Sequence, residues 1–113
     1  MKSIQNRLKS IYENLNMISD DLTVYHYERA EDYSLPYGVW AEEGESDSFN
    51  ADNGKKEQVI EGSLDFYTET EFDPFIDDIQ GVLDSTCCGW VLESVQYEDE
   101  TKLIHYSWSW RIV

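Results

Sequence analysis

The sequence predicts an α+β domain, in which an antiparallel-rich sheet of about five strands carries two helices on one face. Two segments have apolar residues at helical spacing, and the other patterned segments alternate apolar and polar residues as strands do. The predicted order is helix, strand, strand, strand, helix, strand, strand. A chain of 113 residues has the length of one domain, which we take to span residues 1–113.

The first predicted helix runs from Ile4 to Ile18. Its apolar residues recur at intervals of three and four, which places them on one helix face: Ile4, Leu8, Ile11, Tyr12, Leu15 and Ile18. The run Ser19-Asp20-Asp21 ends the helix and begins a turn. We expect this helix to pack on the sheet, and the alternative is a helix that binds a partner or forms an oligomer.

Two short strands are predicted next, from Leu22 to Tyr27 and from Tyr37 to Glu42. Pro36 precedes the second strand, a position where its missing N–H is tolerated. His26 lies between two tyrosines, and a lone histidine in such a strand is more often packed than catalytic. We therefore expect His26 to have a structural role.

A long acidic loop is predicted from about residue 43 to residue 56, where Gly, Asp, Ser and Asn interrupt any periodic pattern. A loop of this length in a compact domain is usually functional or mobile. Its acids do not follow the order of an EF-hand calcium loop, and the closing glutamate is absent, so we expect no metal. The same segment is also long enough to be the arm of a hairpin that reaches a neighbouring subunit.

The centre of the chain combines a strand with a helix. From Val59 to Tyr67, a strand with one buried face is predicted, which bears Ile60, Gly62, Leu64 and Phe66. Asp73-Pro74 then starts a helix, because the acid suits the cap and proline suits the first helical position. Apolar residues follow at helical spacing, and the helix ends by Ser85-Thr86: Phe75, Ile76, Ile79, Val82 and Leu83.

Two strands close the chain as a hairpin. In the first, Trp90 to Tyr97, the simple alternation places Val91, Val95 and Tyr97 on one face and Trp90, Leu92 and Ser94 on the other. In the second, Leu103 to Val113, large residues alternate without interruption, which predicts a central position: Ile104, Tyr106, Trp108, Trp110 and Ile112. His105 lies on its polar face, and no acid or oxyanion hole marks it as catalytic.

Cysteine usage and charge restrict the function further. Cys87 and Cys88 are adjacent and have no other cysteine to pair with, so we expect small apolar fillers near the core in a reducing setting. The formal net charge is −16, from 24 acidic against 8 basic residues, which disfavours binding to nucleic acid or to anionic membrane. The chain has no signal-peptide core and no membrane-spanning run.

Two stretches resemble a known family. These are ADNGKKEQVIEGSLDFYTETEFDPFIDDIQGVL, from Ala51, and the closing SVQYEDETKLIHYSWSWRIV, from Ser94. They are similar to small structural proteins from the morphogenesis cluster of long-tailed bacteriophages and prophages, the tail terminator or tail-completion group, often labelled minor capsid or head-tail connector proteins. The similarity covers about half of the chain, and the element order is compatible over the rest.

The resemblance implies a virion structural protein of the tail or neck, made in the bacterial cytoplasm, that caps the tail tube and joins it to the head connector. It implies a homo-oligomeric ring, typically a hexamer, whose partners are tail-tube or connector proteins, and it implies no catalytic residue, cofactor or metal. An acidic ring would let DNA pass without adhering. The candidate interface with the lumen or a neighbouring subunit then consists of five acids and one aromatic residue: Glu42, Glu43, Glu45, Asp47, Phe49 and Asp52.

Two alternatives stay open from the sequence. One is an acidic interaction protein, a DNA mimic or inhibitor of a nucleic-acid enzyme, which needs acids spaced like phosphates along one face. The other is a small enzyme or ligand-binding domain that uses His26, His105 or the tryptophans, which needs an enclosed pocket with convergent polar groups.

Overall fold

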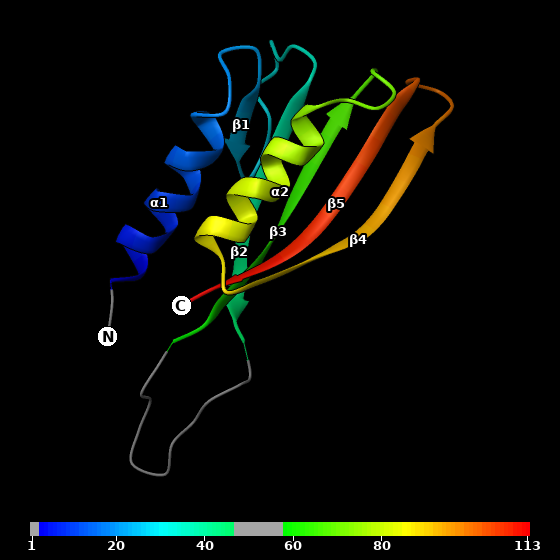
Figure 1. The fold of residues 1–113 in the computed structure, drawn as a ribbon. Coiled ribbons are helices and arrows are strands. Elements are labelled where there is room, and N and C mark those ends of the chain that lie inside the picture. The colour runs from blue at the N-terminus through cyan, green and yellow to red at the C-terminus, as the bar shows by residue number, and fades with distance from the viewer. Residues whose placement is uncertain (1–2, 47–57) are drawn as a thin grey trace, which may run out of the picture.

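A computed structural model describes residues 3–46 and 58–113, and in these ranges it has two helices and five strands in the predicted order (Figure 1). The elements are α1 (Ile4–Asn16), β1 (Thr23–His26), β2 (Tyr37–Glu45), β3 (Ile60–Thr68), α2 (Phe75–Thr86), β4 (Gly89–Glu98) and β5 (Leu103–Ile112). The strands form one sheet in the order β1-β2-β3-β5-β4. The α+β prediction is confirmed.

The sheet is mixed, because β1 pairs with β2 in parallel while the other three pairings are antiparallel. The predicted antiparallel-rich sheet is therefore confirmed, and the first connection is its one parallel exception among the described strands. The chain between His26 and Tyr37 crosses back and brings β2 in the same direction as β1, which a tight turn cannot do. The closing hairpin of β4 and β5 is confirmed, and β5 lies inside the sheet between β3 and β4.

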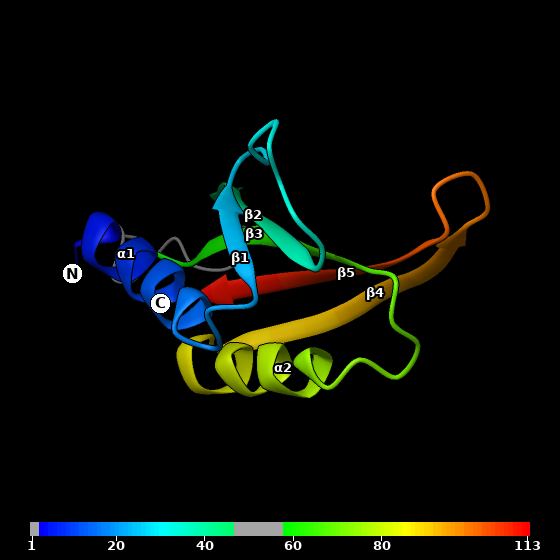
Figure 2. The ribbon, with the colours of Figure 1, turned by 90° about the horizontal axis from the view of Figure 1, so that it is seen from above.

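Both helices lie on the same side of the twisted sheet (Figure 2). The register brings alternate residues of neighbouring strands into rows, and one row runs Trp40, Leu64 and Trp108 across β2, β3 and β5. These residues pack with the apolar faces of α1 and α2 in one buried core, whose helical members are Leu8, Ile11, Leu15, Ile79 and Leu83. Neither of the helices in the described ranges lies on the other face of the sheet.

Helix α2 begins one residue later than the sequence predicts, with Pro74 as the N-cap and Phe75 as the first helical residue. The Asp73 carboxylate accepts a hydrogen bond from the backbone N–H of Phe75 at 2.9 Å and another from the hydroxyl of Thr68 at 2.6 Å. Both Asp73 and Thr68 are buried. The acid therefore satisfies an unpaired N–H of the first helical turn and also fixes the helix start to the end of β3.

Two irregularities place side chains where simple alternation does not. In β2 the pairing shifts between Glu42 and Gly44, so β2 continues to Glu45 and the predicted loop boundary at residue 43 is wrong. In β4 the pairing shifts between Leu92 and Ser94. Each shift is a β-bulge, which inserts one extra residue and reverses the alternation beyond it.

Candidate functional site

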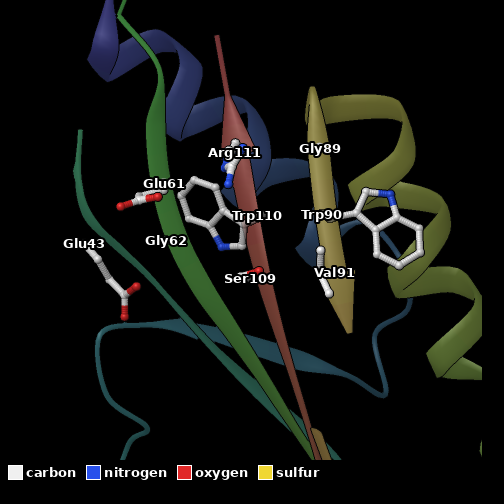
Figure 3. A pocket seen from close by; sticks show the side chains of 9 residues that line it. All are labelled: Glu43, Glu61, Gly62, Gly89, Trp90, Val91, Ser109, Trp110 and Arg111. Atoms are coloured by element: carbon white, nitrogen blue, oxygen red, sulfur yellow. The ribbon is translucent and has the colours of Figure 1, made fainter. Parts of the chain in front are cut away.

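The helix-free face of the sheet contains a groove of about 420 Å³ at the end nearest Gly89 and Arg111 (Figure 3). Glu61 of β3 and Arg111 of β5 are register partners on this face, and Glu43 reaches the groove from the bulge of β2. Val91 of β4 lines the opposite wall, while Trp90 turns away toward α2 (Figure 3). The groove thus combines two carboxylates, one guanidinium and a short apolar wall.

A row of aromatic rings crosses the same face toward its other end. Tyr37 stacks on Tyr67 with 4.8 Å between ring centroids, and Tyr67 stacks on His105 at 4.3 Å. Tyr33 meets Tyr37 edge-on at 4.9 Å, and the guanidinium of Arg29 lies 4.1 Å from the centre of the Tyr33 ring. The rings of Tyr33, Tyr37, Tyr67 and His105 thus form one continuous row of contacts.

Burial and neighbouring charge affect the phenols of this row. Burial, with the nearby Asp65 carboxylate second, raises the pKa of Tyr67 to about 12. Burial also raises the pKa of Tyr37, although a hydrogen bond from Arg29 acts in the opposite direction. Both phenols stay protonated at neutral pH and can donate hydrogen bonds. His105 forms a contact of 2.8 Å between its Nε2 and Asp65 Oδ1, which orients the imidazole.

A second polar cluster lies on the helix side, where β1 and β2 meet α1. The His26 ring is stacked between Tyr27 and Trp40, with centroid distances of 3.7 and 4.0 Å. Glu42 Oε1 lies 2.6 Å from His26 Nε2, and the Tyr27 hydroxyl donates to Glu42 Oε2 at 2.7 Å. The cluster borders an open cleft of about 280 Å³ that Lys9 and Tyr12 of α1 also line. Both carboxylate oxygens of Glu42 are engaged.

These contacts lower the pKa of Glu42. Burial alone would raise it, but the hydrogen bonds from Tyr27 and His26 outweigh that effect. Unfolded Glu42 takes up a proton near its ordinary pKa of 4.5, whereas the folded group does so only at lower pH. The stability that Glu42 contributes is therefore complete above pH 4.5 and is lost as the pH falls through the folded value.

We expect Glu42→Gln to lower the free energy of unfolding by about 1 kcal/mol at pH 7 and by a smaller amount at pH 3. Urea unfolding at both pH values measures the difference. Glu43→Gln is the matched control, since Glu43 is exposed beside it and should be near neutral at both. An equal loss for Glu42→Gln at pH 3 and pH 7 would contradict the role assigned to the carboxylate.

The predicted acidic interface is divided by the bulge in β2. Glu42 faces the helix side and is held by His26 and Tyr27, while Glu43 is exposed and lines the groove on the opposite face. Glu45 accepts a hydrogen bond from the Gln58 amide at 3.0 Å, where the chain returns toward β3. The other three predicted residues lie outside the described residues: Asp47, Phe49 and Asp52.

The two cysteines differ from each other. Cys87 packs against the core, as predicted, and burial raises the pKa of its thiol to about 11. Cys88 is exposed, with its Sγ 3.4 Å from the carbonyl oxygen of Arg111, so the prediction of a filler is wrong for this residue. The chain turns between α2 and β4 at this point, and only one of two adjacent side chains can face the core.

Sequence reasoning missed a third surface, on the helix side of the β4–β5 hairpin. The bulge at Glu93 places Val95 and Tyr97 on the same side as Trp90 and Leu92, so the predicted faces of β4 are wrong. Val95 is 51% exposed and Tyr97 is 58% exposed. Val95 and Tyr97 line an open groove of about 880 Å³, which we call the hairpin groove. Its other walls come from β5, from the turn before β5 and from the loop between β3 and α2. The lining residues are Glu69, Glu71, Val95, Tyr97, Lys102, Ile104 and Tyr106.

Within residues 3–46 and 58–113, no group of three or more His, Cys, Asp or Glu side chains is placed to hold a metal ion. None of the helices in these ranges is long and apolar enough to cross a membrane. The fold and its composition thus define a small acidic α+β protein whose described surface carries several open grooves. No family model matches the sequence, and no curated protein does either.

Proposed function

We propose that the protein is a structural component of a long-tailed bacteriophage or prophage, of the tail terminator or tail-completion type. It would cap the tail tube and join it to the head connector through protein–protein contacts, as a ring of identical subunits in the tail or neck of the virion. It would be made in the bacterial cytoplasm. No bond chemistry is needed for this role.

The observation that carries the proposal is the position of the two stretches that resemble this family. Their described parts, residues 58–83 and 94–113, form β3, most of α2, the distal part of β4 and all of β5. These elements are neighbours, because β3, β5 and β4 are consecutive in the sheet and α2 packs on the same core. The resemblance therefore covers one connected part of the fold, which supports the proposal.

The exposed surfaces fit such a role. The helix-free face presents Glu43 and Glu61, which supports a surface that repels DNA. Acids also lie on the other side of the sheet, where Asp77 and Asp78 occupy the outer face of α2. A DNA mimic needs phosphate-like spacing along one face, so acids on both sides favour the structural role over the mimic.

The test uses the purified protein with tail-tube protein encoded in the same genome. We expect electron microscopy to show ring-shaped density at one end of the tubes and tubes that stop growing when the protein is added. Tubes assembled without the protein are the control. A protein that stays monomeric at high concentration and neither binds the tubes nor changes their length would contradict the proposal.

A further inference from the structure

The two edge strands of the sheet, β1 and β4, differ in whether a side chain covers their outer backbone groups. At β1, the side chain of Asn16 pairs with the backbone of Val24: its amide donates to the Val24 oxygen at 3.0 Å and accepts from the Val24 nitrogen at 2.9 Å. This amide occupies the hydrogen-bonding groups that another strand would use. At the other edge, β4 has ten residues, and among the strands of the described ranges only β5 pairs with it.

The outer half of β4 is also uncovered on its helix side. Helix α2 has 12 residues and a length of about 18 Å, whereas the ten residues of β4 extend about 33 Å. The hairpin therefore runs past the N-terminal end of α2 (Figure 2). Val95 and Tyr97 remain exposed there, above Tyr106 and Ile104 in the hairpin groove.

Acids border this apolar strip. Glu69 and Glu71 form one wall of the hairpin groove, where Lys102 is the one basic residue among its lining side chains. Glu93 points to the opposite side of β4, since it accepts a hydrogen bond from Ser109 at 2.8 Å. The end of the strand and the following turn add further acids: Glu98, Asp99 and Glu100. A second copy paired along this edge would bring the same acids together, which is unfavourable.

We propose that the outer edge of β4 binds an extended segment of a partner protein, which adds to the sheet as a sixth strand and alternates apolar with basic residues. Successive side chains of a strand point to opposite faces. Its apolar residues would extend the strip of Val95 and Tyr97 on the helix side, and its Lys or Arg residues would lie beside Glu93 and Glu98 on the other side. Backbone pairing gives affinity, and the alternation gives specificity.

This inference rests on the proposed function only in that the protein acts through protein–protein contacts. The probe is a fluorescent ten-residue peptide of alternating Val and Lys, which is followed by anisotropy and by hydrogen exchange. A Val/Glu peptide and a peptide with five Val followed by five Lys are the controls. We expect the alternating Val/Lys peptide to bind at least about tenfold more tightly than either control. Bound peptide should slow amide exchange within residues 89–98.

Val95→Lys tests the site. A lysine on an edge strand disfavours pairing with an additional strand, and its charge also repels a basic peptide. We expect this variant to bind the Val/Lys peptide roughly tenfold more weakly than the wild type. Met17→Lys is the matched control: Met17 is 78% exposed at the end of α1, and the charge change is the same. We expect this control to bind like the wild type.

Three results would overturn the inference. The first is equal binding of the alternating and block peptides, which would indicate general attraction to an acidic protein. The second is equal weakening by Val95→Lys and Met17→Lys. The third is a dimer in solution that Val95→Lys dissociates, which would assign the edge to a second copy. If the protein caps tail tubes but does not bind the peptide, this inference alone is rejected. If the protein binds the peptide but does not cap tail tubes, only the proposed function is rejected.

Discussion

Gly62→Ala is expected to destabilise the fold strongly. A Cβ atom at Gly62 would overlap both the carbonyl oxygen of Ala41 on β2 and the indole ring of Trp110 on β5. The carbonyl belongs to the backbone of a paired strand and cannot move without breaking the sheet. Trp110 is also fixed, because it is 1% exposed and donates from its Nε1 to the Ser63 oxygen at 2.9 Å. We expect a loss of about 3 kcal/mol or more, a large part of the stability of a domain this size.

Gly81→Ala is the control for this substitution. Gly81 lies inside α2, and a Cβ atom there meets nothing within 4 Å. Because alanine is a better helix former than glycine, this variant should gain about 0.5–1 kcal/mol. Urea unfolding followed by far-UV circular dichroism measures both. A Gly62→Ala protein that unfolds at the wild-type urea concentration would contradict the close packing of β2, β3 and β5 around this residue.

The sequence contained enough information for the elements and the core. Alternation in β3 and β5 is complete, so Leu64 and Trp108 were placed correctly on the buried face. The Asp73-Pro74 pair identified the start of α2 for the right reason, because the Asp73 carboxylate caps the helix. These features depend on local periodicity and on one side chain acting on its own backbone, and both are visible along the chain.

Strand pairing and bulges were not predictable in the same way. A parallel pairing of β1 with β2 is decided by where the intervening chain crosses, and no local pattern records that. The bulge at Glu93 places Val95 and Tyr97 on the helix side, the same side as Leu92. Unbroken alternation would place both residues on the other face of the sheet. A one-residue shift reverses every later side chain in a strand, so a correct strand can have the wrong face.

The candidate surfaces depend on the same effects. The acidic run in β2 looked like one interface, but the bulge directs Glu42 to the helix side and Glu43 to the opposite groove. The hairpin groove exists because β4 is longer than α2, a comparison that requires both elements to be placed side by side. Both surfaces depend on the relative lengths of neighbouring elements or on shifts in strand pairing. These are properties of the assembled sheet, so the sequence of a single element does not reveal them.

Trp108→Ala is expected to cause a large loss of stability. Trp108 is 1% exposed, lies opposite Leu64 and Leu92, and donates from its Nε1 to Gln80 of α2 at 3.2 Å. Removing the ring leaves a cavity between the sheet and α2 and also breaks this link, so we expect a loss of about 3–5 kcal/mol.

Trp90→Ala provides the comparison, because this tryptophan is only partly buried and donates to the exposed Asp84 at 3.3 Å. We expect its loss to be smaller, about 1–2 kcal/mol, because the site can partly fill with water. Urea unfolding should be followed by far-UV circular dichroism, since each substitution removes a fluorescent ring. Equal losses of stability for the two variants would contradict the role of Trp108 in holding α2 to the sheet. Other core residues would then hold α2 beside the β4–β5 hairpin.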